Sequence, residues 1–297
     1  MRAVDVFAGC GGMSLGFEQA GVEVVAAFDN WKPAVDIYRS NFDHPMYEKD
    51  LCDEDTIDVI KGLKPDVIMG GPPCQDYSIA GKREVGARAN LTIRFAEIVC
   101  GVKPEWVVFE NVYNIERFGT LPVMKTMLSD AGYGLTARVL DASRCGVPQA
   151  RKRFILIGHL GSKDGFLDEA LEAGLSEKQM TVRDYLGDKL GTQYYYMHPR
   201  SYARRGVFSI DEPSATIRGI NRPIPENYKR HHADAAAIED GVRALTTKER
   251  SYLQSFPETF KFEGAKTSVE LAIGNAVPPA LAKYVATRLV EYESDKE

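Results

Sequence analysis

The chain is predicted to be an α/β protein with a doubly wound sheet, helices on both faces and a smaller domain inserted before the last segment. Three observations favour this class. The chain opens with a strand, a glycine-rich turn and a helix, the recurring unit of open α/β sheets. Further short apolar runs end in polar or turn residues, and a loop-rich, irregular stretch covers residues 197–232. A length of 297 residues with 44% apolar residues suits one or two domains with an ample core.

The first strand, turn and helix are expected over residues 3–7, 8–12 and 13–20. Such a turn lets a nucleotide approach the backbone closely, although a turn of this kind is often an ordinary tight turn. It is neither the Gly-x-Gly-x-x-Gly dinucleotide fingerprint nor a phosphate loop. A second strand ends at Asp29, about 20 residues beyond the turn, where a carboxylate suits a ribose hydroxyl pair. A third strand-like piece ends at Asp50 and Leu51, which are placed to flank an adenine ring.

Cys74 lies in an unusual loop after the apolar run 67–69. Two glycines and two prolines precede it at residues 70–73, so the backbone turns tightly and the loop is stiff. Open α/β sheets place their chemistry at the carboxyl ends of strands. A lone cysteine is most often a small buried apolar residue, but a core position does not require two glycines and two prolines before it. The pattern therefore predicts Cys74 as a nucleophile.

Two further signals belong on the same rim. Glu110 follows the apolar run 106–109, so its carboxylate is expected beside Cys74. Arg151 and Arg153 precede another strand, and alternation puts both on one face. Each signal alone is weak, because a Glu after a strand is usually a solvated loop residue and such arginines usually form a surface pair. Together they allow a nucleophile, an acid and two guanidinium groups to converge.

In combination, these segments resemble the cytosine-C5 DNA methyltransferases of the bacterial and phage restriction-modification type. Six motifs carry the resemblance in the family's order, at residues 7–12, 71–75, 110–112, 149–153, 243–257 and 274–278. The resemblance spans nearly the whole chain, and only the stretch 161–241 lacks a motif. The chain departs from the family pattern at Ala89, where a glycine is usual, and at Asn30, where an aromatic residue is usual. Trp31 is the expected substitute for that aromatic residue.

The resemblance implies a fold, a cofactor and a domain division. It implies the S-adenosylmethionine-dependent methyltransferase sheet, with residues 1–165 and 270–297 forming the catalytic and cofactor-binding domain and residues 166–269 forming the target-recognition domain. Residues 275–289 are expected to return to the larger domain as a helix beside the cofactor. The product would be S-adenosylhomocysteine. The residues implied in cofactor binding are Phe7, Gly9, Cys10, Gly11, Gly12, Asp29, Asn30, Asp50, Leu51, Pro73, Leu91, Asn275 and Val277.

The resemblance also implies a mechanism. The Cys74 thiolate adds to carbon 6 of cytosine, and carbon 5 then takes the methyl group. Glu110 hydrogen-bonds ring N3 and the exocyclic amine, as the acid. Arg153 is expected at the base O2, and Arg151 is expected to orient Glu110. The acceptor of the carbon-5 proton stays open between a water and a side chain.

Double-stranded DNA is the implied substrate, with the target base flipped out of the stack. The net charge of −5 argues mildly against a nucleic-acid partner, but residues 197–232 carry a net charge of +4. Base-edge contacts are expected from Arg218, Gly219 and Arg222. Phosphate contacts are expected from Arg204, Arg205, Lys229 and Arg230. The loop after Cys74 adds Gln75, Ser78, Lys82 and Arg88, and the alternative for all these residues is a solvated loop.

Two other functions remain open at this stage. One family branch methylates tRNA with nearly the same motifs, and a non-catalytic relative would only bind cofactor or a partner protein. A monomer is expected, with a cognate restriction endonuclease acting separately. The five cysteines show neither metal-ligand spacing nor a disulfide pattern, so no metal is expected and a reducing bacterial cytoplasm suits them. No apolar span of membrane length is recognised.

Overall fold

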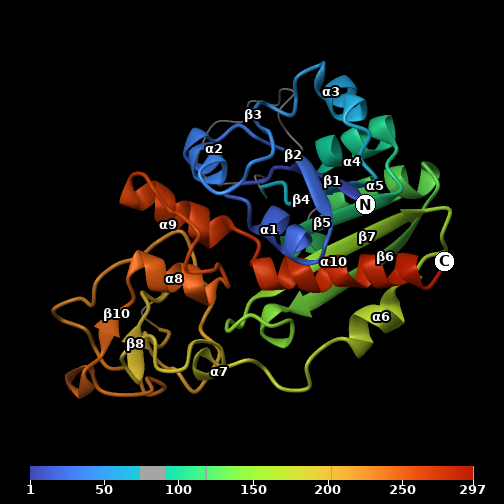
Figure 1. Ribbon diagram of the computed structural model, residues 1–297. Coiled ribbons are helices and arrows are strands. Elements are labelled where there is room, and N and C mark those ends of the chain that lie inside the picture. Colours follow the sequence, from blue (N-terminus) through green and yellow to red (C-terminus); the bar gives the residue numbers. More distant parts are fainter. Residues whose placement is uncertain (74–90, 118, 202, 297) are drawn as a thin grey trace.

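The structure of the protein is a computed structural model that describes residues 1–73, 91–117, 119–201 and 203–296 (Figure 1). A seven-stranded sheet has the order β3-β2-β1-β4-β5-β7-β6. Its strands are β1 (Arg2–Val6), β2 (Glu23–Asp29), β3 (Met46–Glu48), β4 (Val67–Gly70), β5 (Trp106–Val112), β6 (Tyr133–Asp141) and β7 (Lys152–Leu160). Neighbours from β3 to β5 pair in parallel, whereas β7 is antiparallel to both β5 and β6.

Helices cover both faces of this sheet, which confirms the predicted doubly wound class (Figure 1). One face carries α1 (Gly12–Gln19), α6 (Asp168–Ala173) and α10 (Pro279–Ser294). The other carries α3 (Thr56–Gly62), α4 (Leu91–Val102) and α5 (Thr120–Asp130). The central strands are buried on both sides, as strands are in parallel sheets. A Cβ on Gly16 would lie 2.4 Å from the Pro279 carbonyl oxygen, so this glycine lets α1 and α10 pack closely.

A smaller sheet with the order β10-β8-β9 lies to one side of the large sheet (Figure 1). This part contains α7 (Val182–Leu186), β8 (Tyr194–Tyr196), β9 (Val207–Ser209), β10 (Arg243–Ala244), α8 (Thr247–Leu253) and α9 (Lys266–Asn275). The remaining helix, α2 (Lys32–Arg39), contacts α9. Short 3-10 turns occur at Ile115–Arg117, Ala142–Arg144 and Ile238–Asp240.

Packing is continuous between the two sheets. Cys10 and Ile37 belong to the same buried cluster as Tyr195 and Phe256, and Leu167 lies in the core of the large sheet. Side chains on both sides of the expected boundaries therefore pack together. The division at residues 165 and 269 stays a prediction.

Three sequence-based boundaries were wrong. The third strand ends at Glu48 and not at Asp50, and β5 continues through Glu110 to Val112 because β7 pairs with it along that length. The expected helix over residues 275–289 begins only at Pro279. Prolines at 278 and 279 have no N–H to donate, so α9 cannot continue through them.

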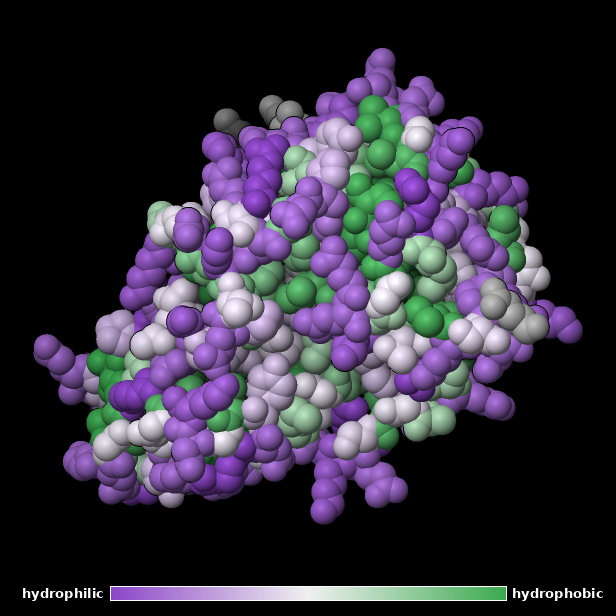
Figure 2. All heavy atoms as spheres, in the orientation of Figure 1, coloured by the Kyte–Doolittle hydropathy of each residue, from purple (hydrophilic) through white to green (hydrophobic). Residues whose placement is uncertain are grey.

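Polar side chains cover most of the face seen in Figure 2, with apolar groups in small areas between them. In the part of the chain that the structure describes, no helix combines the length and the apolar character needed to cross a membrane.

Candidate functional site

The carboxyl ends of four adjacent strands are level with one another. The register places Val6 opposite both Phe28 and Gly70, and it places Gly70 opposite Phe109. The turn after β1, the end of β2, the loop after β4 and the polar end of β5 therefore share one edge of the sheet. This is the edge at which the sequence predicts the site.

The turn after β1 is shaped for close approach. Phe7 has a φ of 61°, a left-handed conformation that is rare outside glycine, and Gly9 and Gly11 are also left-handed. A Cβ on Gly9 would meet nothing within 4 Å, whereas one on Gly12 would lie 2.1 Å from the Val277 carbonyl oxygen. The turn is thus packed on one side and open at Gly9, so it fits a group that lies against bare backbone.

Asp29 ties β2 to this turn. Its Oδ2 accepts from the Gly9 amide at 2.8 Å, and its Oδ1 accepts from the Trp31 amide at 2.8 Å. Burial raises the pKa of Asp29 above its ordinary value, while the backbone hydrogen bonds oppose that shift. Each carboxylate oxygen retains a further lone pair, which fits contact with hydroxyl groups. Asn30 is exposed, and Trp31 packs against the cluster between the two sheets.

The other residues predicted to bind the cofactor differ in exposure. The Cys10 thiol is buried 3.6 Å from the Ala272 carbonyl oxygen, and burial raises its pKa to about 12, so its side chain faces α9. Leu51 is buried, with its carbonyl accepting from Arg94 Nε at 2.7 Å. The residues with at least partial exposure are Asp50, Pro73, Leu91, Asn275 and Val277.

Glu110 is the buried acid of this edge, with 7% of its surface exposed. Arg153 Nε lies 2.8 Å from Glu110 Oε1. Burial raises the pKa of Glu110 above its ordinary value, and the positive charges of Arg153 and then Arg151 oppose that shift. Burial thus favours the protonated carboxyl group, whereas the two arginines favour the charged form.

The loop that leads to Cys74 begins in contact with Glu110. A Cβ on Gly71 would lie 3.0 Å from Glu110 Oε2, and Asn111 Nδ2 donates to the Pro72 carbonyl at 3.0 Å. Asn111 is therefore a positioning residue that sequence reasoning did not assign, although it stands in the motif beside Glu110. The predicted residues Cys74, Gln75, Ser78, Lys82 and Arg88 lie outside the described residues.

The charge of Arg151 acts on Glu110, but its hydrogen bonds go to backbone carbonyls. The contact with Glu110 that the sequence predicts for Arg151 is made by Arg153. Arg151 is 1% exposed and donates to the carbonyls of Ile217, Gly274 and Ala276 at 3.0 to 3.1 Å. It thus joins the start of β7 to the smaller part of the chain.

Basic residues gather in the predicted recognition region. Burial and then the Arg200 charge lower the pKa of Arg218, and burial, Arg222 and Arg218 lower that of His198. These groups are close enough to repel one another. Within the described ranges, no ion pair to an acid is formed by Arg200, Arg204, Arg218, Arg222, Lys229 or Arg230. Such a cluster favours an anionic partner.

Two residues that the sequence predicts to contact DNA make their contacts within the protein. Arg205 forms a forked ion pair with Glu212 and lies over the Phe208 ring, so its charge is balanced within the protein. Gly219 packs on α9, where a Cβ would lie 2.6 Å from Leu271 Cδ1. The phosphate contact expected of Arg205 is therefore not supported.

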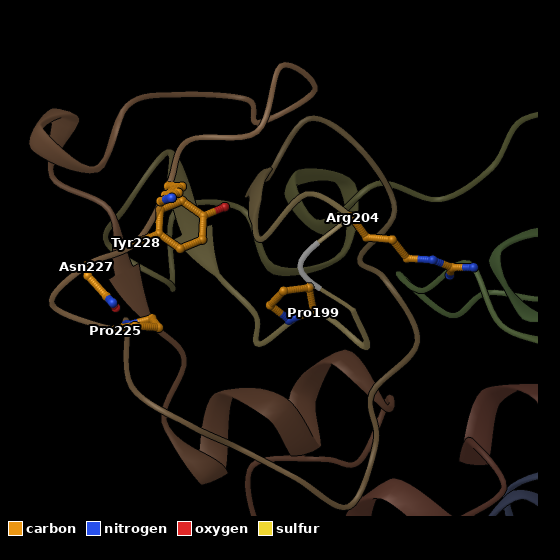
Figure 3. A pocket seen from close by; sticks show the side chains of 6 residues that line it. Pro199, Arg204, Pro225, Asn227 and Tyr228 are labelled. Atoms are coloured by element: carbon orange, nitrogen blue, oxygen red, sulfur yellow. The ribbon is translucent and has the colours of Figure 1, made fainter.

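A pocket of about 360 Å³ opens in the same region. In Figure 3, Pro199 and Arg204 line one side, and Pro225, Asn227 and Tyr228 line the other. Lys229 completes the lining. The Tyr228 hydroxyl donates to Asp234 Oδ2 at 2.8 Å, which fixes its ring.

A buried network beneath the turn after β1 was not foreseen. Asp5 is 1% exposed, and its Oδ2 accepts from the Ser14 hydroxyl at 2.6 Å. Tyr38 donates to Ser14 at 2.7 Å, and its hydroxyl lies 2.6 Å from His44 Nε2. Burial raises the pKa of Asp5 to about 7. The sequence signal for this network was Asp5 itself, which is the one acid in the first apolar strand.

At the opposite edge, Glu105, His159 and Glu293 bring three potential metal-ligand atoms within 4.8 Å of one another. The Lys296 ammonium lies 3.2 Å from His159 Nε2 and 3.3 Å from Glu293. Lys296 thus supplies a positive charge where a metal ion would otherwise be needed, so the cluster is consistent with an ion-pair network.

The comparisons with known proteins agree with one another. Residues 1–291 match the family model described as C-5 cytosine-specific DNA methylase. The Type II methyltransferase M.HindV of Haemophilus influenzae is 55% identical over 298 residues, covering 99% of this chain and 98% of the relative. The Type II methyltransferase M.HgiDI of Herpetosiphon aurantiacus is 53% identical over 294 residues, covering 98% and 95%. The crystal structure of S. pombe Dnmt2 methyltransferase has a TM-score of 0.74 at 19% identity over 99% of both chains, a likeness of fold.

Proposed function

Because this chain belongs to the C-5 cytosine-specific DNA methylase family and is a DNA cytosine methyltransferase that uses S-adenosylmethionine, we propose that it methylates a flipped cytosine in a short duplex site through a covalent adduct of Cys74. The observation that supports this assignment of the catalytic residues is the buried ion pair between Glu110 and Arg153. It lies where the loop toward Cys74 begins.

Cys74 acts as the nucleophile in this proposal. Its thiolate adds to carbon 6 of the cytosine, and the ring electrons move toward carbon 5, where the methyl group is received. Loss of the carbon-5 proton then lets the thiolate leave, which restores both the ring and the enzyme. Free thiols have a pKa near roughly 8.5, so a positive neighbour would be needed to favour the thiolate.

Glu110 and Arg153 keep negative charge off the ring. A protonated Glu110 donates to ring N3, and its second oxygen accepts from the exocyclic amine. Its raised pKa supports this protonated form. Arg153 holds Oε1 of Glu110, and its guanidinium group has further N–H donors for the base O2.

The residues of the β1 turn fit the cofactor. S-adenosylmethionine supplies an activated methyl group when bound. Asp29 would hold ribose hydroxyls, the backbone at Gly9 would lie against the cofactor, and Val277 would support Gly12 from behind. Asp50 and Leu51 would flank the adenine ring, as the sequence suggests.

The basic cluster would meet the DNA. Arg218 and Arg222 would read base edges, and Arg204, Lys229 and Arg230 would contact phosphates. The absence of ion pairs for these cations within the described residues supports this assignment, because a polyanion would relieve their repulsion. The pocket beside Arg204 and Lys229 would seat part of the backbone.

We further propose residues 166–269 as the target-recognition domain, a monomeric enzyme, a bacterial cytoplasmic location and a separate cognate restriction endonuclease. The bacterial relatives are named as Type II methyltransferases, which supports the last of these proposals.

The test is transfer of labelled methyl from S-adenosylmethionine to unmethylated duplex DNA and, in parallel, to unmodified tRNA. Bisulfite sequencing then locates the label. We expect label on cytosine in one short duplex motif, and none with Cys74→Ala. Label on tRNA alone would contradict the proposed substrate, and methylation by Cys74→Ala would contradict the nucleophile.

A further inference from the structure

Residues 217–222, which we call the recognition strap, run along α9 with alternating exposure. Ile217 is fully buried, Gly219 is packed on Leu271, and Asn221 donates to buried acceptors. By contrast, Ile220 is 48% exposed and Arg222 is exposed. The strap therefore presents every second side chain outward.

A buried ion pair lies behind the strap. Arg250 in α8 and Glu270 in α9 are 2% and 4% exposed, and Arg250 Nε lies 2.7 Å from Glu270 Oε2. Such a pair is costly to bury and is weak evidence of a stabilising role by itself. Its remaining contacts show what it holds.

Those contacts go to the strap. Arg250 Nη2 donates to the carbonyls of Arg218 and Ile220. Glu270 Oε1 accepts from Asn221 Nδ2 at 2.9 Å and from the Thr247 hydroxyl at 2.6 Å. The ion pair thus holds the strap at three points, which are the Arg218 carbonyl, the Ile220 carbonyl and the Asn221 side chain.

The start of the strap is held from the segment just before β7 of the large sheet. Gln149 Oε1 accepts from the Ile217 amide at 2.8 Å, and Arg151 donates to the Ile217 carbonyl at 3.0 Å. A Cβ on Gly274 would lie 2.2 Å from the Gly219 amide nitrogen, so strap and α9 touch backbone to backbone. The strap is therefore bound both to the segment before β7 and to α9.

We propose that Arg250 and Glu270 are positioning residues for DNA sequence discrimination, because they fix the strap so that Arg218, Ile220 and Arg222 face the DNA with a set spacing. This inference rests on the proposed function of the strap arginines. Base-edge recognition needs donors in a defined geometry, whereas phosphate contacts tolerate movement. Loosening the strap should therefore reduce discrimination between sites more than overall binding.

The test variant is the double substitution Arg250→Met and Glu270→Leu, which leaves no unpaired buried charge. The matched control is Arg183→Met with Asp211→Asn, which removes an ion pair in the same part of the chain that does not contact the strap. If the double variant does not fold, Asn221→Ala is used in its place, because it removes the hydrogen bond between the strap and Glu270 and keeps the ion pair. Folding is checked by thermal melting followed by circular dichroism.

The measurement is kcat/KM on the cognate duplex and on duplexes with one base pair changed, after bisulfite sequencing has identified the wild-type site. A single mismatched base pair typically weakens specific binding by roughly tenfold or more, so we expect the discrimination ratio to fall about tenfold in the double variant. The control should keep the wild-type ratio, and both should bind S-adenosylmethionine within about twofold of wild type. A folded double variant with unchanged discrimination would overturn the inference.

Arg218→Ala and Arg222→Ala separate this inference from the proposed function. If they reduce discrimination and the double variant does not, only the positioning role fails. If neither alanine variant changes discrimination, the strap does not read DNA, and both the proposed contacts and the inference fail.

Discussion

Replacing Asp5 by Asn should remove a pH-dependent part of the free energy of unfolding. Asp5 is buried in β1, and only one of its oxygens, Oδ2, has a hydrogen-bond partner among the described residues, the Ser14 hydroxyl. Burial is the main cause that raises its pKa, from 3.8 to about 7, and the charge of Asp29 adds to it. Asn has nearly the same shape as the protonated acid and does not titrate.

The sign follows from proton linkage. The folded state holds the Asp5 proton more tightly than the unfolded state, so this group's stabilisation is complete below pH 3.8 and is lost as the pH rises to about 7. One unit of pKa corresponds to about 1.4 kcal/mol, so the full effect is about 4 kcal/mol. Between about pH 5.5 and about pH 8 the wild type should lose about 2 kcal/mol through this group.

The assay is urea unfolding of the wild type and of Asp5→Asn across that pH range. The free energy of unfolding of the variant, relative to the wild type, should rise by about 2 kcal/mol from the acidic to the alkaline end. Other titrating groups affect both proteins equally and cancel in the difference. Ser14→Ala serves as the control, because it removes the hydrogen bond and keeps the titration. A difference that does not change with pH would refute the reasoning.

Three further predictions concern the candidate site. Cys74→Ala should abolish methyl transfer and keep the dissociation constant for S-adenosylmethionine, measured by calorimetry; residual transfer at the wild-type rate would contradict the nucleophile. Gly12→Ala should weaken cofactor binding about tenfold or more, because its Cβ would lie 2.1 Å from the Val277 carbonyl oxygen and overpacking costs about 1–3 kcal/mol. An unchanged affinity would contradict this prediction and would show that the Val277 backbone can move to accept the added methyl group. Arg153→Met should lower kcat about 100-fold and, because a positive charge is lost, raise the pKa of Glu110. The alkaline limb of its rate profile should move to higher pH, and a downward shift would exclude Glu110 as the acid.

The strand and turn pattern was largely predictable because it is local. Glycines in the β1 turn have positive φ values that other residues rarely adopt, and each apolar run formed a strand. The level edge of the sheet then follows from parallel pairing. Boundaries were less predictable, since Glu110 lies inside β5 only because β7 pairs along it.

Side-chain partners were not predictable in the same way. The spacing of Arg151 and Arg153 indicated a shared face, but it did not show which of them meets Glu110. Arg151 binds carbonyls 66 to 125 residues away in the sequence, and no local pattern reports such contacts. The charge of Arg205 is likewise balanced by Glu212, which the excess of basic residues concealed.

The sequence by itself determined the family, the chemistry and the order of the elements, because these depend on residue types at fixed spacings. Tertiary structure alone decided that Arg153 pairs with Glu110, that Arg151 joins the two parts of the chain, and that Arg250 and Glu270 lie behind the recognition strap. A buried charge must find its partner among whatever groups the fold brings within a few ångströms, and that set exists only after distant segments have packed together.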